Sequence, residues 1–248
     1  MSQGYRRPNT PSDVERQLRQ EAGFGCAKCG HPYIEYHHIV PVAEEPHFRP
    51  DDMVALCGNC HPAVAKLGRD QQYEFKNDPH NVRKGILKGA LEFDKRDLLF
   101  KVGGNWYENT PIILQFLSTP IISCSLKDGQ ARVSLNLLDP AGQSMLRVDE
   151  NDVSFRVDDL WDFEYSHNFA VARYGPRDIA LRIDFRGSEA VIEGKIWLGR
   201  SQVKLGPRES TLPGSNVFRG NRVSNSRVGI QIGNPASANP NPASSGIA

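Results

Sequence analysis

Two short cysteine pairs, Cys26-Ala27-Lys28-Cys29 and Cys57-Gly58-Asn59-Cys60, decide how the N-terminal part of this chain folds. Each pair forms a turn that brings two thiolates within reach of one ion, and two such turns complete a tetrahedral four-thiolate site. A lone pair of this kind can also be a redox centre, but two pairs within 35 residues favour zinc. Four thiolates leave no open coordination position, so we expect Cys26, Cys29, Cys57 and Cys60 to bind a structural Zn²⁺.

Histidines lie between and beside these pairs. The segment Tyr36-His37-His38-Ile39-Val40-Pro41 separates the two pairs, and His61 follows the second pair directly. The combined order of these motifs over residues 20–68 resembles the HNH (ββα-metal) endonuclease family. The resemblance implies a β-hairpin followed by a helix around one catalytic divalent metal.

The resemblance also implies roles for single residues. His38 is expected to be the general base that activates water, while His37 and His61 hold the catalytic cation, Mg²⁺ or another divalent metal. Adjacent strand residues point to opposite faces, so His37 and His38 need a local bend if both serve one site; otherwise one of them packs against the hairpin. Asp52 stands where the family usually has the Asn that orients the base, and a carboxylate can hold the histidine equally well or add a ligand.

Composition and charge limit the classes of protein that fit. The chain has 248 residues and a formal net charge of +1, and residues 1–90 hold 12 Lys/Arg against 11 Asp/Glu. Any nucleic-acid surface must therefore come from the arrangement of charges rather than from their excess. Residues 1–11 lack the apolar segment of a signal peptide, and the most apolar stretch, residues 110–126, is broken by prolines. We expect a cytoplasmic protein with no membrane partner.

Periodicity predicts an α+β chain. A helix is expected over residues 11–22 with Thr10 as its cap and Pro11 at its first position, a short helix over 60–67, and a further helical stretch over about 82–91. Strict alternation of apolar and polar residues predicts antiparallel strands at residues 131–137, 153–157, 179–185 and 190–198. We expect a zinc-stapled ββα-metal module in residues 1–92, a small all-β, sandwich-like domain in 93–206, and a flexible tail in 207–248. No internal repeat is evident within residues 1–210.

The tail contains one apolar segment at residues 216–234. Its centre, Ile230-Gln231-Ile232-Gly233, resembles the RIP homotypic interaction motif, and the whole segment is similar to bacterial and fungal amyloid signalling motifs. The resemblance implies in-register stacking on a protein partner with the same motif. The alternatives are a final strand docked on the β domain, or a segment without fixed structure.

Two functions fit these features. The first is a metal-dependent endonuclease that hydrolyses phosphodiester bonds in DNA, or in RNA, and acts in a bacterial defence or cell-death system. The second is a non-catalytic zinc module that binds nucleic acid or protein, in which Asp52 marks lost activity. Cleavage of plasmid DNA in the presence of added divalent metal distinguishes the two.

Overall fold

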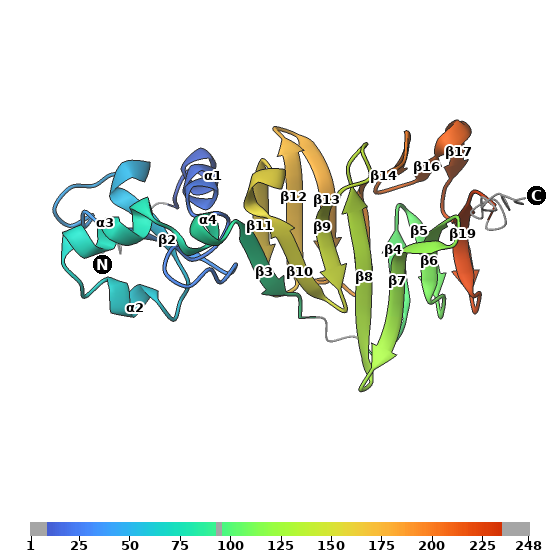
Figure 1. Ribbon diagram of the computed structural model, residues 1–248. Coiled ribbons are helices and arrows are strands. Elements are labelled where there is room, and N and C mark those ends of the chain that lie inside the picture. Colours follow the sequence, from blue (N-terminus) through green and yellow to red (C-terminus); the bar gives the residue numbers. More distant parts are fainter. Residues whose placement is uncertain (1–8, 93–95, 235–248) are drawn as a thin grey trace, which may run out of the picture. The chain divides into compact units, whose positions relative to one another are not determined.

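The computed structural model describes residues 9–92 and 96–234, and the chain forms two compact units (Figure 1). Unit 1 comprises residues 1–91 and 152–182, and unit 2 comprises residues 92–151 and 183–248. Strand β13 (Asp178–Asp184) crosses the boundary between them. No helix in the described residues is both long enough and apolar enough to cross a membrane. The predicted class is confirmed: a few helices with a four-cysteine cluster, followed by a part built of strands.

The N-terminal part of unit 1 is a β-hairpin surrounded by helices. Strand β1 (Glu35–His38) pairs with β2 (Met53–Leu56) in an antiparallel register that is regular over all four residue pairs. The short helix α2 (His61–Val64) follows the second cysteine pair directly, as the sequence predicted. The other helices of this part are α1 (Ser12–Glu21), α3 (Arg69–Asn77) and α4 (His80–Lys84).

Two helix predictions need correction. The helix expected over residues 82–91 is wrong, because α4 ends at Gly85, whose φ of 68° lies in the left-handed region. Glycine adopts this conformation without a Cβ penalty and commonly terminates helices. The chain then continues as β3 (Ile86–Ala90), which pairs antiparallel with β10 (Asp152–Arg156). At α1 the capping position is Pro11, which has no capping side chain, rather than Thr10.

Residues 152–182 belong to the same compact unit as the zinc module, whereas the sequence predicted them within a β domain of residues 93–206. They form β10, β11 (Asp162–Ser166) and β12 (Phe169–Gly175), of which β11 and β12 pair antiparallel. Arg19 on α1 forms a bidentate, buried ion pair with Asp162, with Nε–Oδ1 at 2.9 Å and Nη2–Oδ2 at 2.8 Å. A second contact is the aromatic pair Phe24 and Phe155, whose centroids lie 5.9 Å apart. The structure thus divides the chain differently from the linear domains that composition suggested.

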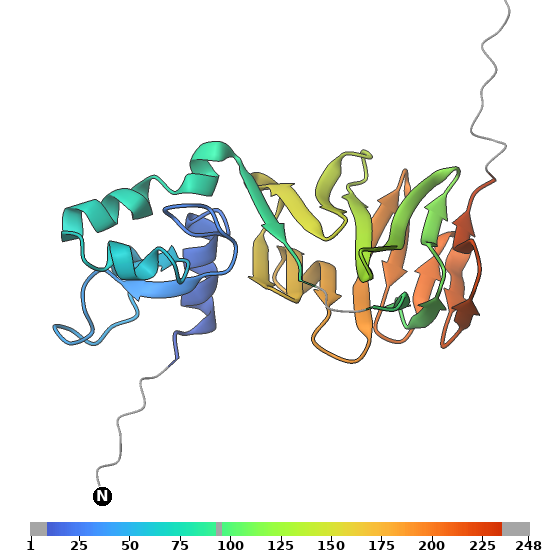
Figure 2. The same ribbon diagram turned by 90° about the horizontal axis from the view of Figure 1, so that it is seen from below.

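Unit 2 consists of two layers of strands, which are visible in Figure 2. In one layer, the successive strands from β6 to β9 pair antiparallel. In the other layer, the successive strands from β14 to β17 pair antiparallel, and β4 pairs parallel with β14. Strand β8 lies against β14, and alternate residues of both strands are buried between the layers. The sandwich-like architecture is confirmed. The strands of the layers are β6 (Ile112–Phe116), β7 (Thr119–Lys127), β8 (Gln130–Leu138), β9 (Ser144–Asp149), β14 (Ala190–Leu198), β15 (Ser201–Leu205), β16 (Ser210–Leu212), β17 (Asn216–Phe218), β4 (Leu99–Val102) and β5 (Asn105–Glu108).

Residues 207–234 are part of this β structure, which corrects the expectation of a flexible tail. Strand β18 (Arg222–Ser224) pairs parallel with β5, and β19 (Val228–Ile232) pairs parallel with β6 (Figure 1). Ile230 is only 6% exposed. The alternating apolar and polar residues of this segment therefore form strands that pair with the β domain. The backbones of β5 and β6 are their hydrogen-bond partners. Residues 235–248 of the predicted tail lie outside the described residues.

Candidate metal centres and active site

The four cysteines come together as predicted. Their Sγ atoms all lie within 4.8 Å of one another, and the Sγ atoms of Cys29 and Cys57 are 3.6 Å apart. A tetrahedral ion with metal–sulfur bonds of about 2.3 Å separates its sulfur ligands by about 3.8 Å, so the cluster fits a structural zinc site. Burial raises the pKa of the Cys29 thiol to about 11, and the nearby Cys26 adds to the rise. A divalent cation stabilises the thiolates against this crowding.

The cysteine cluster is joined to the hairpin by a small apolar core. Cys26 and Cys57 are buried together with Ile39, Val54 and Leu56. The backbone N–H groups of Cys60 and His61 both donate to the carbonyl of Cys57, at 2.9 Å each. These bonds form the second cysteine turn and start α2, so the cysteine turn itself sets the position of His61.

His37 and His61 face each other across β1 and α2. Their ring centroids lie 4.8 Å apart, and Nδ1 of His37 is 3.0 Å from Nε2 of His61. The outer nitrogen of each ring has its own partner. Nε2 of His37 lies 2.8 Å from Oε1 of Gln72, and Nδ1 of His61 lies 2.8 Å from a carboxylate oxygen of Glu35.

These outer partners determine which ring nitrogens carry protons. The Glu35 carboxylate only accepts hydrogen bonds, so Nδ1 of His61 must be the donor. The side-chain amide of Gln72 is fixed because its Nε2 donates to the Leu67 carbonyl at 2.9 Å, which turns Oε1 toward His37. Nε2 of His37 is therefore also a donor. Nδ1 of His37 and Nε2 of His61 then face each other at 3.0 Å, and either a proton or a metal cation shared between them makes this approach favourable.

The pair could hold a divalent metal. Metal–nitrogen bonds of about 2.1 Å place two imidazole ligands of one ion about 3 Å apart, which the His37–His61 geometry matches. Burial lowers the pKa of His37 below its ordinary value, against the hydrogen bond that His37 donates to Gln72, and nearby His61 lowers it further. The ring thus stays neutral at physiological pH, which is the form that binds metals.

His38 lies on the other face of β1. The ladder is regular across His37 and His38, without the bend that would turn both to one side. Nε2 of His38 is 3.0 Å from the backbone carbonyl oxygen of His47, so this nitrogen carries the proton and Nδ1 has the lone pair that a general base needs. His47 is itself fixed, because its Nε2 donates to the Val40 carbonyl at 2.9 Å and its Nδ1 accepts from the Arg49 N–H at 3.1 Å.

Asp52 has partners other than the base histidine. One carboxylate oxygen accepts from the Tyr73 hydroxyl and the other from Nε of Arg49, both at 2.7 Å. These two hydrogen bonds, that of Tyr73 first, lower the pKa of Asp52 below its usual value. The family resemblance implied that Asp52 orients the ring of His38. In the structure, the backbone carbonyl of His47 accepts the hydrogen bond from His38 Nε2.

The sequence analysis missed four residues that form hydrogen bonds with the candidate site residues: Glu35, His47, Gln72 and Tyr73. Glu35 precedes His37 by two positions, and strand periodicity places both on one face, so this signal was available. Gln72 and Tyr73 lie on α3, which the sequence analysis did not anticipate, and their roles depend on contacts 35 and 21 residues away along the chain.

Comparison with known proteins agrees with this geometry. Residues 25–66 match the HNH endonuclease family. The matched HNH segment runs from the first cysteine pair through α2, and it includes the hairpin with both adjacent histidines. Searches of curated proteins and of solved structures found no match. The family match supports a nuclease-type or nucleic-acid-binding function for this segment.

Proposed function

We propose that the HNH segment is the active site of a metal-dependent endonuclease that hydrolyses phosphodiester bonds in DNA. The observation that carries the proposal is the His37–His61 pair. The two facing ring nitrogens lie 3.0 Å apart and each ring is fixed by an outer hydrogen bond, a geometry that suits two ligands of one divalent cation. A zinc module that only binds its partners has no need of such a second metal position.

The metal would be held by Nδ1 of His37 and Nε2 of His61. When bound, it supplies positive charge that neutralises the scissile phosphate and stabilises the leaving oxygen. Two imidazole ligands favour a transition metal such as Mn²⁺ or Ni²⁺, because Mg²⁺ prefers oxygen ligands. Activity is therefore expected to be higher with Mn²⁺ or Ni²⁺ than with Mg²⁺.

His38 acts as the general base in this proposal. Its Nδ1 takes a proton from water, the water oxygen attacks phosphorus, and the phosphorus–oxygen ester bond breaks on the opposite side. The His47 carbonyl keeps the ring in the required tautomer by accepting from Nε2 at 3.0 Å. Because His38 and His37 leave the strand on opposite faces, the substrate phosphate must reach over the end of β1, where His38 is the last residue.

Two arginines offer contacts for the nucleic-acid backbone. Arg49 and Arg69 have side chains that are 45% and 48% exposed, and each pairs with a glutamate, Glu45 and Glu44 respectively. Exposed ion pairs contribute little stability, so a phosphate can replace either glutamate at small cost. In a segment whose net charge is near zero, these two arginines thus offer local positive charge to a phosphate.

Plasmid cleavage by the purified chain tests the proposal. Mn²⁺, Ni²⁺ and Mg²⁺ are added in turn, with EDTA as the negative control. His38→Ala is expected to lower the cleavage rate by about 10²- to 10⁴-fold without loss of zinc, as removal of a general base does. His37→Ala is expected to raise the metal concentration needed for activity, while His31→Ala, a change at an exposed histidine of the same module, leaves both unchanged.

The binding-only alternative has one observation in its favour, namely that Arg49 and Tyr73 engage the carboxylate of Asp52. It predicts that the chain binds DNA but cuts none with any metal, and that Asp52→Asn changes nothing. Cleavage at the wild-type rate by His38→Ala would instead remove His38 from its assigned role. A place in a bacterial defence or cell-death system remains part of this proposal and rests on the resemblance of the 216–234 segment alone.

A further inference from the structure

Two segments far apart in the chain share one pattern. Residues 105–117 read NWYENTPIILQFL, and residues 221–233 read NRVSNSRVGIQIG. In both, an Asn is followed by a second Asn four positions later and by a Gln ten positions later. The second member of this repeat contains Ile230, Gln231, Ile232 and Gly233, the residues of the expected interaction motif.

The structure stacks the two segments in parallel and in register. On β5, Trp106 and Tyr107 pair with Arg222 and Val223 of β18. On β6, every pair joined to β19 keeps the same separation of 116 positions that links Asn105 to Asn221. Figure 1 shows β6 and β19 side by side. Each paired residue of one segment therefore lies beside its own counterpart in the other.

Side-chain amides form ladders between the counterparts. Oδ1 of Asn105 accepts from the backbone N–H of Asn221 at 3.0 Å and from its Nδ2 at 3.2 Å. Nδ2 of Asn109 donates to Oδ1 of Asn225 at 3.1 Å. Such amide ladders between identical side chains, together with stacked aliphatic residues, stabilise in-register cross-β stacks.

The two backbones also turn at equivalent places. Positive φ angles occur at Asn109 (48°) and Asn225 (54°), and again at the counterparts Leu117 (52°) and Gly233 (77°). Gly104 and Gly220, at 75° and 65°, mark the start of each segment, and the Gly220 N–H donates to the Gly104 carbonyl at 3.3 Å. The two segments thus have the same bent backbone and stack on each other. Residues 105–117 (β5 and β6) are called the first rung, and residues 221–233 (β18 and β19) the second rung.

The second rung has an open edge. Within residues 9–92 and 96–234, β18 pairs with β5 alone and β19 with β6 alone. The Leu117 N–H donates to the Ile232 carbonyl at 2.8 Å, so Ile232 directs its backbone polar groups toward the first rung. The backbone N–H and C=O groups of successive strand residues point to alternate sides of the strand. Those of Gly229 and Gln231 therefore point away from the first rung. Unpaired strand edges of this kind add further strands readily.

We propose that this edge binds a partner protein through an extended segment with the same Asn-x₃-Asn-x₅-Gln spacing, which adds as a third rung. The charge on the rungs specifies one more feature of that segment. Glu108 on the first rung accepts from Nη2 of Arg222 at 2.8 Å and from the Ser224 hydroxyl at 3.1 Å. A partner with an acidic residue directly before its second Asn repeats this pairing on the outer side of Arg222.

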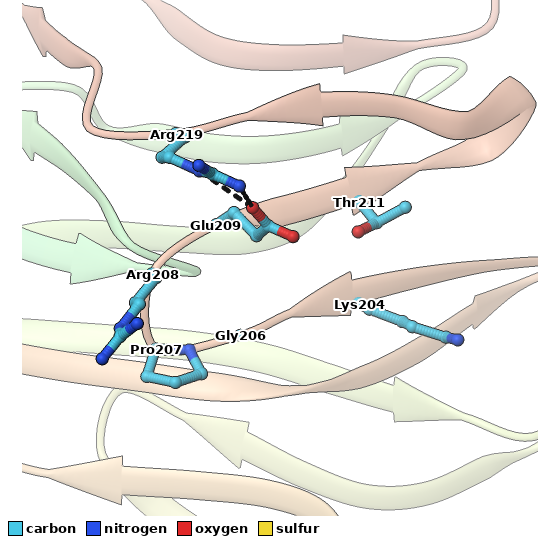
Figure 3. Close-up of a pocket in the computed structure, with 7 residues that line it drawn as sticks. All are labelled: Lys204, Gly206, Pro207, Arg208, Glu209, Thr211 and Arg219. Carbon is cyan, nitrogen blue, oxygen red and sulfur yellow. Dashed lines mark hydrogen bonds and ion pairs between the residues drawn. The ribbon is translucent and has the colours of Figure 1, made fainter.

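The occupant is a different protein rather than a second copy of this chain. Both edges of the first rung are already occupied, since β5 pairs with β4 and β18, and β6 with β7 and β19. A copy of the second rung would place Arg222 beside Arg222, and like charges directly opposite are destabilising. The residue before Gly220, Arg219, is also held in place. Figure 3 shows its side chain turned toward Glu209, with Nε and Oε2 2.9 Å apart.

Binding of a labelled peptide of residues 104–118 to the full chain tests this proposal. Fluorescence anisotropy is expected to show saturable binding at about 0.15 M salt, and hydrogen exchange is expected to slow at Gly229 and Gln231. A peptide of scrambled order should not bind, and a peptide of residues 220–234 should bind more weakly until about 1 M salt screens the arginines. Equal binding of the scrambled peptide, or protection elsewhere in the chain, overturns the proposal.

A charge swap tests the register. The double variant Glu108→Arg/Arg222→Glu keeps an ion pair between the rungs but reverses its direction. It is expected to bind the wild-type peptide about five-fold more weakly and to prefer the Glu108→Arg peptide, while the wild-type chain shows the opposite order. An unchanged preference overturns the proposed register. Self-association of the wild-type chain that protects Gly229 and Gln231 without peptide overturns the proposed occupant.

Discussion

Buried polar side chains fix the geometry of the candidate active site and of the two stacked segments through their hydrogen bonds. Gln72 is 5% exposed and fixes the tautomer of His37, and Asn105 is 1% exposed. The amide of Asn105 donates to the carbonyls of Gly103 and Phe218, at 2.8 and 3.1 Å, besides accepting from Asn221. Gln72 belongs to no sequence motif, whereas Asn105 is the first residue of the repeated Asn-x₃-Asn-x₅-Gln pattern. Both side chains matter because a buried polar group without a hydrogen-bond partner is costly.

Gln72→Leu is expected to weaken binding of Mn²⁺ by about 10- to 100-fold, because the Nε2–H of His37 then loses its acceptor and the tautomer is no longer fixed. Calorimetric titration of the zinc-loaded protein measures this affinity. Gln72→Glu keeps an acceptor and should bind nearly as the wild type does. Gln71→Leu, at the exposed neighbouring glutamine, is the matched control. Wild-type affinity in Gln72→Leu would show that the pair does not depend on this hydrogen bond.

Asn105→Ala is expected to lower the free energy of unfolding of unit 2 by about 3 kcal/mol, because it removes the hydrogen bonds of a buried amide to the Gly103 carbonyl, the Phe218 carbonyl and the Asn221 N–H, each worth about 1 kcal/mol. Urea denaturation followed by tryptophan fluorescence measures the loss. Asn216→Ala removes one exposed hydrogen bond to the Pro213 carbonyl and should change stability by less than about 0.5 kcal/mol. Similar stability of the two variants would contradict the role given to Asn105.

At the scale of elements, the β1–β2 hairpin depends on the cysteine cluster. Each strand has four residues, and the core next to the cysteines contains few large side chains. A two-stranded hairpin of this length is marginal in water without further support. The four thiolates supply that support when they share one ion, because metal binding contributes directly to folding.

Removal of zinc should therefore unfold residues 20–68 and leave unit 2 folded. Chelation, or Cys60→Ser, is expected to abolish slow hydrogen exchange in β1 and β2 and to release the metal, which elemental analysis quantifies. Cys124→Ser is the control: this cysteine is buried in unit 2, where it donates to the Thr110 carbonyl at 3.3 Å, and zinc content should stay unchanged. A hairpin that stays protected after complete chelation would count against a structural role for zinc.

At the scale of the whole molecule, the zinc module is completed by a segment that follows it by sixty residues. Residues 152–182 return to unit 1 and bring Asp162 to Arg19, and Nη1 of Arg19 in turn donates to the Tyr36 hydroxyl on β1 at 3.0 Å. Breaking a buried ion pair by removing one partner costs about 3–5 kcal/mol. The stability of the hairpin is thus linked to strands that belong to the β-rich half of the sequence.

A fragment of residues 1–91 is accordingly expected to lose zinc to a chelator much faster than the full chain does. A second fragment, in which residues 1–91 are joined by a flexible linker to residues 152–182, should retain zinc at nearly the rate of the full chain. Zinc release monitored with a colorimetric chelator compares the three proteins. Equal release from both fragments would mean that residues 152–182 do not stabilise the module.

The sequence by itself determined the features that depend on short spacing. Two CxxC pairs and the histidines between and after them specify the zinc cluster, the hairpin and the HNH match, because a turn of four residues sets the distance between its own ligands. Period-two alternation likewise located β8, β10, β13 and β14, since it needs only the burial of one strand face.

Only the tertiary structure decided which distant groups meet. Gln72 reaches His37 across 35 positions, Arg19 reaches Asp162 across 143, and Asn105 reaches Asn221 across 116. The last contact turned a predicted flexible tail into the second rung of a stack, because the partner of residues 221–233 is a segment of the same pattern in another part of the chain. Spacing along a sequence fixes local geometry, but a strand or a titratable ring takes its final role from the partner that folding places beside it.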